Sequence, residues 1–165
     1  MSQSGLTDAS REKAWAAWYA DHLRIMVTVP GITSAQRFTT TTPGHPPSLA
    51  MYTVASAAVF DDPYYRSIRG MGEWQPLMDP RHYHRNLFAG QDDAPDVPDD
   101  RVLIVVDAER PAEFPGLALI WLTAAGLDRS TPHRGVAVVD GATADALARH
   151  GVAVYRPDGR RVTAR

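Results

Sequence analysis

The chain has 165 residues, and its 44% hydrophobic content is enough to build the core of one domain of ordinary size. The absence of cysteine excludes disulfide bonds, iron–sulfur clusters, thiolate zinc sites and a thiol nucleophile. A formal net charge of -2 predicts no general attraction to nucleic acid or to an anionic membrane surface.

Membrane and export signals are not found in the sequence. No stretch approaches the roughly 20 consecutive apolar residues of a membrane helix. The first residues carry neither the basic start nor the apolar centre of a signal peptide. We therefore expect a protein of the cytoplasm.

An amphipathic helix is predicted from Ser10 to Val27, because aromatic and apolar residues recur there with a helical period. Ser10 is a good helix cap, and the Pro-Gly pair at 30–31 ends the helix. Strands are then predicted over 32–38 and 49–55, paired as a hairpin across a turn rich in threonine and proline.

A short helical turn is predicted after Ser56, and a second helix runs from Asp62 to Arg69, because Asp is a good cap and Pro fits the first helical position. Residues 81–89 alternate like a strand. Nothing before Ser10 is apolar enough to predict a strand there.

Residues 91–100 hold five aspartates and two prolines and predict an acidic, solvated linker. This linker divides the chain into a first unit, residues 1–90, and a second unit, residues 101–165. The first unit is rich in aromatic residues and histidines, so we expect any chemistry there. The second unit predicts strands over 102–106, 117–124, 135–139 and 152–156, and a helix over 141–150.

Several short phrases of the first unit carry a family resemblance. They are Trp18-Tyr-Ala-Asp-His-Leu23, Val29-Pro-Gly31, Ala35-Gln-Arg-Phe38, Leu49-Ala-Met-Tyr52, and Ser67 to Arg69 after Pro63-Tyr-Tyr65. A helix with Trp-Tyr, two variable positions and His-Leu, followed by a Pro-Gly turn into a strand, resembles the EthD-like group of the dimeric α+β barrel (ferredoxin-like) superfamily. The resemblance covers residues 11–90.

The resemblance implies an α+β fold in which helices cover one face of an antiparallel sheet. The family's repeat is strand, helix, strand, strand, helix, strand. The first unit lacks the opening strand of this repeat, and the second lacks the first helix. We therefore expect two degenerate repeats packed together, with the strand 102–106 in the position of the missing opening strand. The uncovered apolar face of such a sheet predicts a homodimer through sheet-to-sheet packing.

His22 falls on the aromatic face of the first helix, one turn after Trp18, so its side chain is predicted to point inward. In EthD-like proteins the matching histidine faces the cavity between helix and sheet. A neutral imidazole in apolar surroundings is a candidate general base near neutral pH. The alternative is a core histidine that hydrogen-bonds a carbonyl at the helix end.

His82 and His84 lie two apart on a predicted strand, which places both imidazoles on one face. The opposite face would carry Arg81, Tyr83 and Arg85. The pair could act in catalysis, lie at a surface, or bind a metal together with His22 and Asp79. Spacing alone supplies too few certain ligands, so we expect no metal.

Aromatic residues of the first unit are expected to wall a pocket for a flat ring. The candidate substrate-binding residues are Trp18, Tyr19, Tyr52, Tyr64, Trp74 and Arg85. Tyr65 is a candidate catalytic residue beside the histidines, and Arg69 or Arg85 could neutralise a carboxylate or phenolate. The same aromatics would also suit the core of a small protein without cysteine.

These residues favour a small cofactor-independent enzyme that transfers a proton on an aromatic or polyketide-like molecule, as an isomerase, cyclase, lyase or decarboxylase. Two alternatives stay open: a cofactor-free monooxygenase of the same fold, and a non-catalytic dimeric protein that binds a ligand. A buried cluster of histidines that is exposed to water favours an enzyme. A cavity filled by Trp and Tyr, with His22 bonded only to backbone, favours the non-catalytic role.

Overall fold

The structure is a computed structural model that describes residues 1–148 and 152–165. Its strands are β1 (Ser2–Ser4), β2 (Ile32–Thr39), β3 (Ser48–Val54), β4 (His84–Ala89), β5 (Arg101–Ala108), β6 (Ile120–Leu127), β7 (His133–Asp140), β8 (Ala153–Pro157) and β9 (Val162–Thr163). Its α-helices are α1 (Glu12–Met26), α2 (Pro63–Ile68) and α3 (Gly141–Ala148), and 3-10 helices lie at Ala9–Arg11, Ala57–Asp61 and Gly72–Leu77. Positions 149–150 of the helix expected in the second unit lie outside the described residues.

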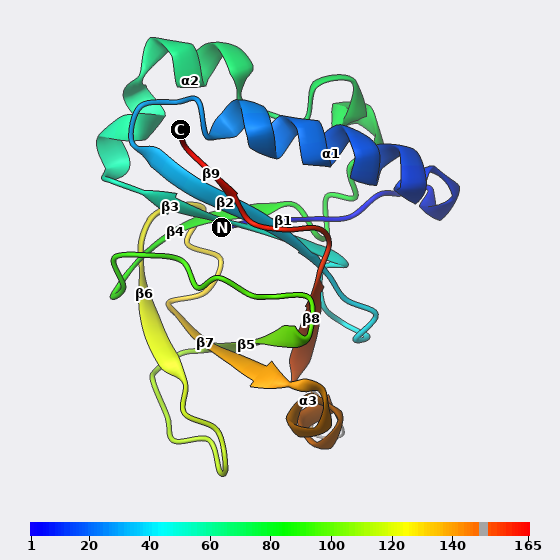
Figure 1. Cartoon of the computed structure of the whole chain (residues 1–165), viewed down its shortest axis with the longest axis vertical. Coiled ribbons are helices and arrows are strands. Elements are labelled where there is room, and N and C mark those ends of the chain that lie inside the picture. Colours follow the sequence, from blue (N-terminus) through cyan, green and yellow to red (C-terminus); the bar gives the residue numbers. More distant parts are fainter. Residues whose placement is uncertain (149–151) are drawn as a thin grey trace.

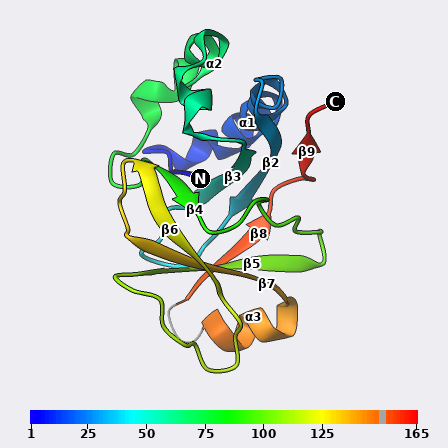
Figure 2. The same cartoon turned by 90° about the vertical axis from the view of Figure 1, so that its left-hand side faces the viewer.

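All strand pairings in the described chain are antiparallel, and they form one sheet that closes on itself. The order is β3-β1-β4-β6-β7-β5-β8-β2, and β2 pairs back onto β3 from Ile32 to Thr39. β9 lies beside β2 on the same edge as β8. The wall is therefore a closed eight-stranded β-barrel (Figures 1 and 2).

Helices cover the barrel on two opposite sides (Figure 1). α1 and α2 pack on the outer face of β2 and β3, where a helix-side core includes Trp15, Tyr19, Met26, Ala35 and Tyr65. α3 packs on the outer face of β5 at the other end of the molecule. No helix in residues 1–148 and 152–165 is long and apolar enough to cross a membrane.

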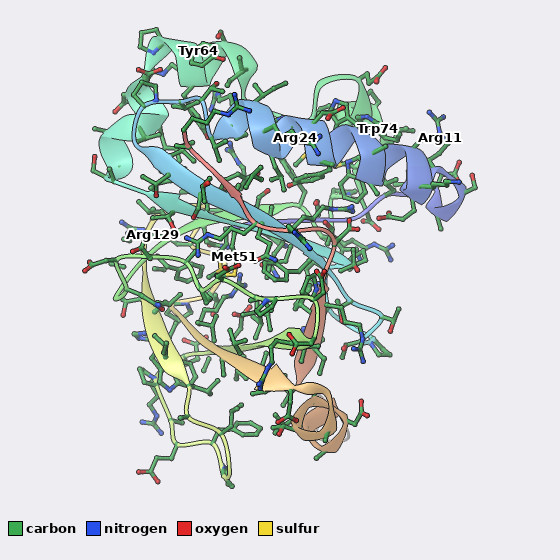
Figure 3. All side chains as sticks on the ribbon, viewed as in Figure 1. Arg11, Arg24, Met51, Tyr64, Trp74 and Arg129 are labelled. Atoms are coloured by element: carbon green, nitrogen blue, oxygen red, sulfur yellow. The ribbon has the colours of Figure 1, made fainter. Side chains whose placement is uncertain are left out.

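The inside of the barrel holds a second core, the barrel core. Its buried members are Phe38, Leu49, Met51, Val97, Leu103, Val105, Leu122, Val136, Ala153 and Tyr155. Met51 points from β3 into this space, whereas Trp74 lies on the side of α1 (Figure 3). Strands from both sides of residues 91–100 supply this core, because β2 and β3 face β5, β6, β7 and β8 across it.

The expectation of an open ferredoxin-like sheet with helices on one face is wrong. β6, β7, β5 and β8 stand between β4 and β2 and complete a closed wall. The wall closes because the apolar inner face of β2 and β3 is buried against Leu103, Val105 and Leu122 of the same chain. The face for which a sheet-to-sheet homodimer was expected is thus covered within one chain.

The expectation that no strand precedes the first helix is also wrong. β1 pairs with Ser48–Ala50 of β3 and with His84 and Arg85 of β4. The strand expected at 102–106, which is β5, therefore does not take the position of the opening strand. It pairs with β7 and β8 instead. The backbone of β1 is paired on both sides, and the Gln3 side chain accepts a hydrogen bond of 2.7 Å from Arg134.

Residues 91–100 contain no helix or strand, yet they are fixed to the barrel. Val97 is buried in the barrel core, and its N–H and C=O both hydrogen-bond the side-chain amide of Gln36, at 3.2 and 2.8 Å. Ala94 donates its N–H to the Thr53 hydroxyl at 2.9 Å. This segment therefore crosses from β4 to β5 in contact with β2 and β3.

Candidate functional site

A cavity of about 140 Å³ lies beneath α1, beside β3 and β4. α1 lines it with Tyr19, His22 and Met26, which share one helix face because they are three and four residues apart. Tyr52 of β3 and Tyr65 of α2 line it as well. The cavity thus lies where the first helix, the hairpin and the second helix meet.

His22 is held by aromatic rings. Its imidazole stacks on Trp18 with ring centroids 4.8 Å apart and an interplanar angle of 11°. It meets the ring of Tyr19 edge-on at 5.8 Å. Within the described part of the chain, no hydrogen bond is made by either imidazole nitrogen. Burial lowers the pKa of His22 to about 4, so the ring is neutral at pH 7 and both nitrogens can bind a ligand.

Two tyrosine hydroxyls of the cavity stay protonated at neutral pH. Burial raises the pKa of Tyr52 well above its usual value. Burial also raises the pKa of Tyr65, although the guanidinium groups of Arg85 and Arg69 oppose this rise. A protonated phenol donates a hydrogen bond, so the hydroxyl of Tyr65 suits an oxygen acceptor on a ligand.

Arg69 and Arg85 bring two guanidinium groups to the cavity wall, Arg69 exposed and Arg85 half-buried. Neither side chain forms an ion pair or hydrogen bond with any other described residue. The fully buried Arg37 and Arg134, by contrast, are both paired with carboxylates. Two unpaired guanidiniums beside a phenol form an anion-binding arrangement.

The cavity wall brings together five of the ten candidate catalytic and substrate-binding residues, with Arg69 beside them. The five are His22, Tyr65, Tyr19, Tyr52 and Arg85. Helical periodicity indicated that Tyr19 and His22 face inward, whereas Arg85 was expected on the strand face opposite the histidine pair.

Three expected substrate-binding residues lie outside the cavity wall. Trp18 is the stacking partner behind His22. Trp74 packs 6.5 Å from Trp18 and lies under the Arg11 guanidinium at 5.3 Å (Figure 3). Tyr64 is 44% exposed on α2 and shares a hydrogen bond of 2.9 Å with the Thr28 hydroxyl. Trp18 and Trp74 thus shape the helix side, and Tyr64 faces solvent.

His82 and His84 do not line the cavity. β4 begins at His84, and His82 lies in the preceding turn, where its N–H donates to the Asp79 carbonyl at 3.0 Å. The two imidazoles therefore do not share a strand face. Tyr83 and Arg85, expected on the opposite face, are the residues that reach the cavity.

The four groups considered for a metal site are not gathered at one point. Arg81 donates to both carboxylate oxygens of Asp79, at 3.0 and 3.1 Å, and these bonds lower the pKa of Asp79 to about 2. Within residues 1–148 and 152–165, no group of three His, Asp or Glu side chains could hold a metal ion.

Sequence reasoning missed one side of the cavity. Met51, Phe88 and Leu122 line it from the barrel core, together with Ala94 from the segment 91–100. These residues lie far apart in the sequence and meet only because the sheet closes. No local pattern could have joined them.

No family model, no curated protein and no solved structure matches the chain. The resemblance to EthD-like proteins is therefore unsupported, and the closed barrel contradicts the fold that it implied. The phrases that suggested it describe an aromatic helix followed by a hairpin, which unrelated folds share.

Proposed function

We propose that this chain binds a small aromatic acid in the cavity and transfers a proton on it through His22. The observation that carries this proposal is the imidazole of His22, which faces the cavity with both nitrogens free of hydrogen bonds among the described residues. The cavity is open, and His22 is not bonded to backbone, which favours an enzyme over a filled aromatic core.

The charge of the ligand follows from the cations on the wall. Arg69 and Arg85 lack carboxylate partners in the described chain, and a bound carboxylate would supply one. The protonated hydroxyl of Tyr65 lies within the field of both guanidiniums and can donate to the same acceptor. An anionic group is therefore expected beside these three side chains.

The size of the ligand follows from the cavity volume. An apolar cavity of about 150 Å³ is enough for one benzene ring. The cavity of about 140 Å³ thus favours a single ring over the fused rings of a polyketide. Aromatic and methionine side chains such as Tyr19, Tyr52 and Met26 provide the contact surface for that ring.

Proton transfer is the chemistry that His22 can supply. The neutral ring can take a proton from an acidic C–H or O–H of the bound ligand and return it to another atom of that ligand. The charge that forms on the ligand would lie close to Arg69 and Arg85 and be stabilised there. An isomerase, a lyase or a cyclase uses such a step.

Binding without catalysis is the second candidate. It is favoured by the pKa of about 4 for His22, which makes the free ring a weaker base than the optimum near pH 7. An anionic ligand would raise this pKa, because a negative charge nearby stabilises the imidazolium. The two candidates therefore differ in what happens once the ligand is bound.

Phenylpyruvate tests both candidates, because it is a single-ring acid with an acidic benzylic C–H. We expect the protein to accelerate loss of the benzylic proton signal in D2O, and His22→Gln to slow the protein-catalysed exchange by roughly 10²–10⁴-fold. Binding is followed separately by the shifts of the His22 imidazole signals. Tyr64→Phe is the control, because Tyr64 lies outside the cavity wall.

The outcomes separate the candidates. If binding depends on Arg69 and Arg85 but the benzylic protons exchange no faster than in free phenylpyruvate, the chain binds a ligand without catalysis. If neither benzoate nor phenylpyruvate shifts any cavity signal at millimolar concentration, the aromatic-acid proposal is wrong.

A further inference from the structure

The cavity is lined from both cores of the molecule. Successive residues of a strand point to opposite faces, so Tyr52 faces the helix-side core and Met51 faces the barrel core. Both line the cavity. Arg85 and Phe88 point to opposite faces of β4, and both of them line the cavity as well. A single cavity can touch both faces of two strands only if it passes through the wall between them.

The register of β1 explains the opening in the wall. β1 joins β3 to β4, but it pairs only with Ser48–Ala50 on β3. Within the described chain, no strand pairs with Met51–Val54 on the side that faces β4. The amino-terminal end of β1 lies beside β3 and β4 (Figure 2). The ligand space therefore begins where the pairing of β1 stops.

The two ends of this opening differ in chemistry. The helix side carries His22 with the guanidiniums of Arg69 and Arg85. The barrel side carries Met51, Phe88 and Leu122, which belong to or pack on the barrel core. Two polar side chains also line this side, and both already have partners. The Thr53 hydroxyl accepts hydrogen bonds from Ser34 and Ala94, and the Asn86 amide is hydrogen-bonded to Ser130.

The rim beyond the apolar end is acidic. Asp92 and Asp93 are exposed and line the cavity from the segment 91–100. Carboxylates at this end repel a ligand carboxylate, whereas the guanidiniums at the other end attract it. Both effects orient an aromatic acid in the same direction, with its acid group toward α1 and its far edge toward the barrel core.

We propose that the ligand is an aromatic acid with a small apolar substituent opposite its acid group. The ring lies in the opening between β3 and β4, and the substituent lies against Met51, Phe88 and Leu122. This inference rests on the proposed function, since it assumes that an aromatic acid is bound, and it adds the substitution pattern that the site selects.

The test compares the affinities of benzoate, 4-methylbenzoate and terephthalate, measured by calorimetry on the full chain. The extra methyl group should tighten binding by about four-fold, the factor that corresponds to one buried methylene. Terephthalate should bind more weakly than benzoate, because its second carboxylate enters the apolar end beside Asp92 and Asp93.

Leu122→Phe fills the apolar end and should remove the preference for 4-methylbenzoate while benzoate still binds. Ile120→Phe is the matched control, because Ile120 points to the same face of β6, is 45% exposed and does not line the cavity. If Leu122→Phe does not fold, Leu122→Ala replaces it. This variant enlarges the apolar end, so 4-isopropylbenzoate should then gain affinity relative to 4-methylbenzoate.

The failures are distinguishable. If benzoate binds in an Arg69- and Arg85-dependent manner but the methyl group adds nothing, the substitution pattern is wrong and the proposed function stands. An equal loss of affinity for benzoate and for 4-methylbenzoate in Leu122→Phe would also overturn the inference, since the ring itself would then lie in the barrel core. If benzoate does not bind, the proposed function fails first.

Discussion

The imidazole of His22 lies between an indole face and a phenol edge, in a position where its charge is costly. Burial lowers its folded-state pKa to about 4, below the ordinary histidine value of 6.5. The neutral form is thus favoured by folding. The associated stability is present above pH 6.5 and is lost as the pH falls toward 4.

His22→Gln should therefore flatten the acid side of the stability profile. Between pH 7 and pH 4 the wild-type chain should lose up to about 3 kcal/mol of unfolding free energy that the variant does not lose. Urea unfolding at several pH values measures this difference. Parallel profiles for the two proteins would show that the imidazole is hydrated and not buried.

The same residue predicts how ligand binding depends on pH. A bound anion raises the pKa of His22, so binding takes up a proton in the range between the free and the bound pKa. The affinity for benzoate should increase as the pH falls from 7 to 5, and this increase should vanish in His22→Gln. Calorimetry in buffers of different ionisation enthalpy would detect the proton uptake directly.

Arg37 is a buried residue that joins three elements. It pairs with Glu12 of α1 and with Asp158 after β8, donates to Ser48 of β3 at 3.0 Å, and stacks over the ring of Trp15 at 4.6 Å. Arg37→Met should lower the unfolding free energy by about 2–4 kcal/mol, because it removes the cation from this network.

A surface ion pair is the control for Arg37. Arg66 pairs with Asp61, and both side chains are more than half exposed. Arg66→Gln should change the unfolding free energy by less than about 0.5 kcal/mol. Equal losses in the two arginine variants, measured by urea unfolding, would mean that the Arg37 network adds no more than a surface pair.

At the scale of elements, the acidic segment 91–100 shows how a loop becomes part of a wall. Its five aspartates predict a solvated linker. Val97 nevertheless lies in the barrel core, and the Gln36 side chain hydrogen-bonds the N–H and the C=O of Val97. The segment closes one side of the cavity, so its anchor also helps to shape the site.

Gln36→Ala should loosen this segment. It leaves the N–H and C=O of Val97 without partners in a buried position, at a cost of about 1–3 kcal/mol. The exchange of the Val97 amide with D2O should accelerate, as measured by NMR. Gln75→Ala is the control, since Gln75 is exposed and its side chain forms no hydrogen bond with any described residue. Unchanged Val97 exchange would show that packing alone holds the segment.

At the scale of the whole molecule, the two halves of the wall depend on each other. One half of the wall has the strand order β4-β1-β3-β2, and the other half has the order β8-β5-β7-β6. Counted along the chain within each half, both orders are fourth, first, third, second. The barrel core lies between the two sets of strands, so neither set can bury its inner face alone.

We therefore expect the described barrel to unfold as one cooperative unit. The amides of Leu49 in β3 and Leu103 in β5 should exchange with free energies that agree within about 1 kcal/mol. Native-state hydrogen exchange monitored by NMR measures both values. A value for one strand that is lower by several kcal/mol would show that the two halves open separately.

Local patterns in the sequence were enough for most elements and part of the site. Helical spacing placed Tyr19 and His22 on the inner face of α1, and Asp62 before Pro63 indicated the start of α2. These features depend on residues within a few positions of one another, so periodicity and capping can predict them. The absence of thiol chemistry likewise follows from composition.

The closure of the sheet was decided only by the tertiary structure. β1 is too polar to be recognised as a strand. It is held in the wall by its pairing with β3 and β4 and by the hydrogen bond from Arg134 to Gln3, 131 residues away. The same long-range packing brings Leu122 opposite Met51 and makes one cavity from two cores. Such contacts depend on the burial of surfaces distant in the chain, which no local period records.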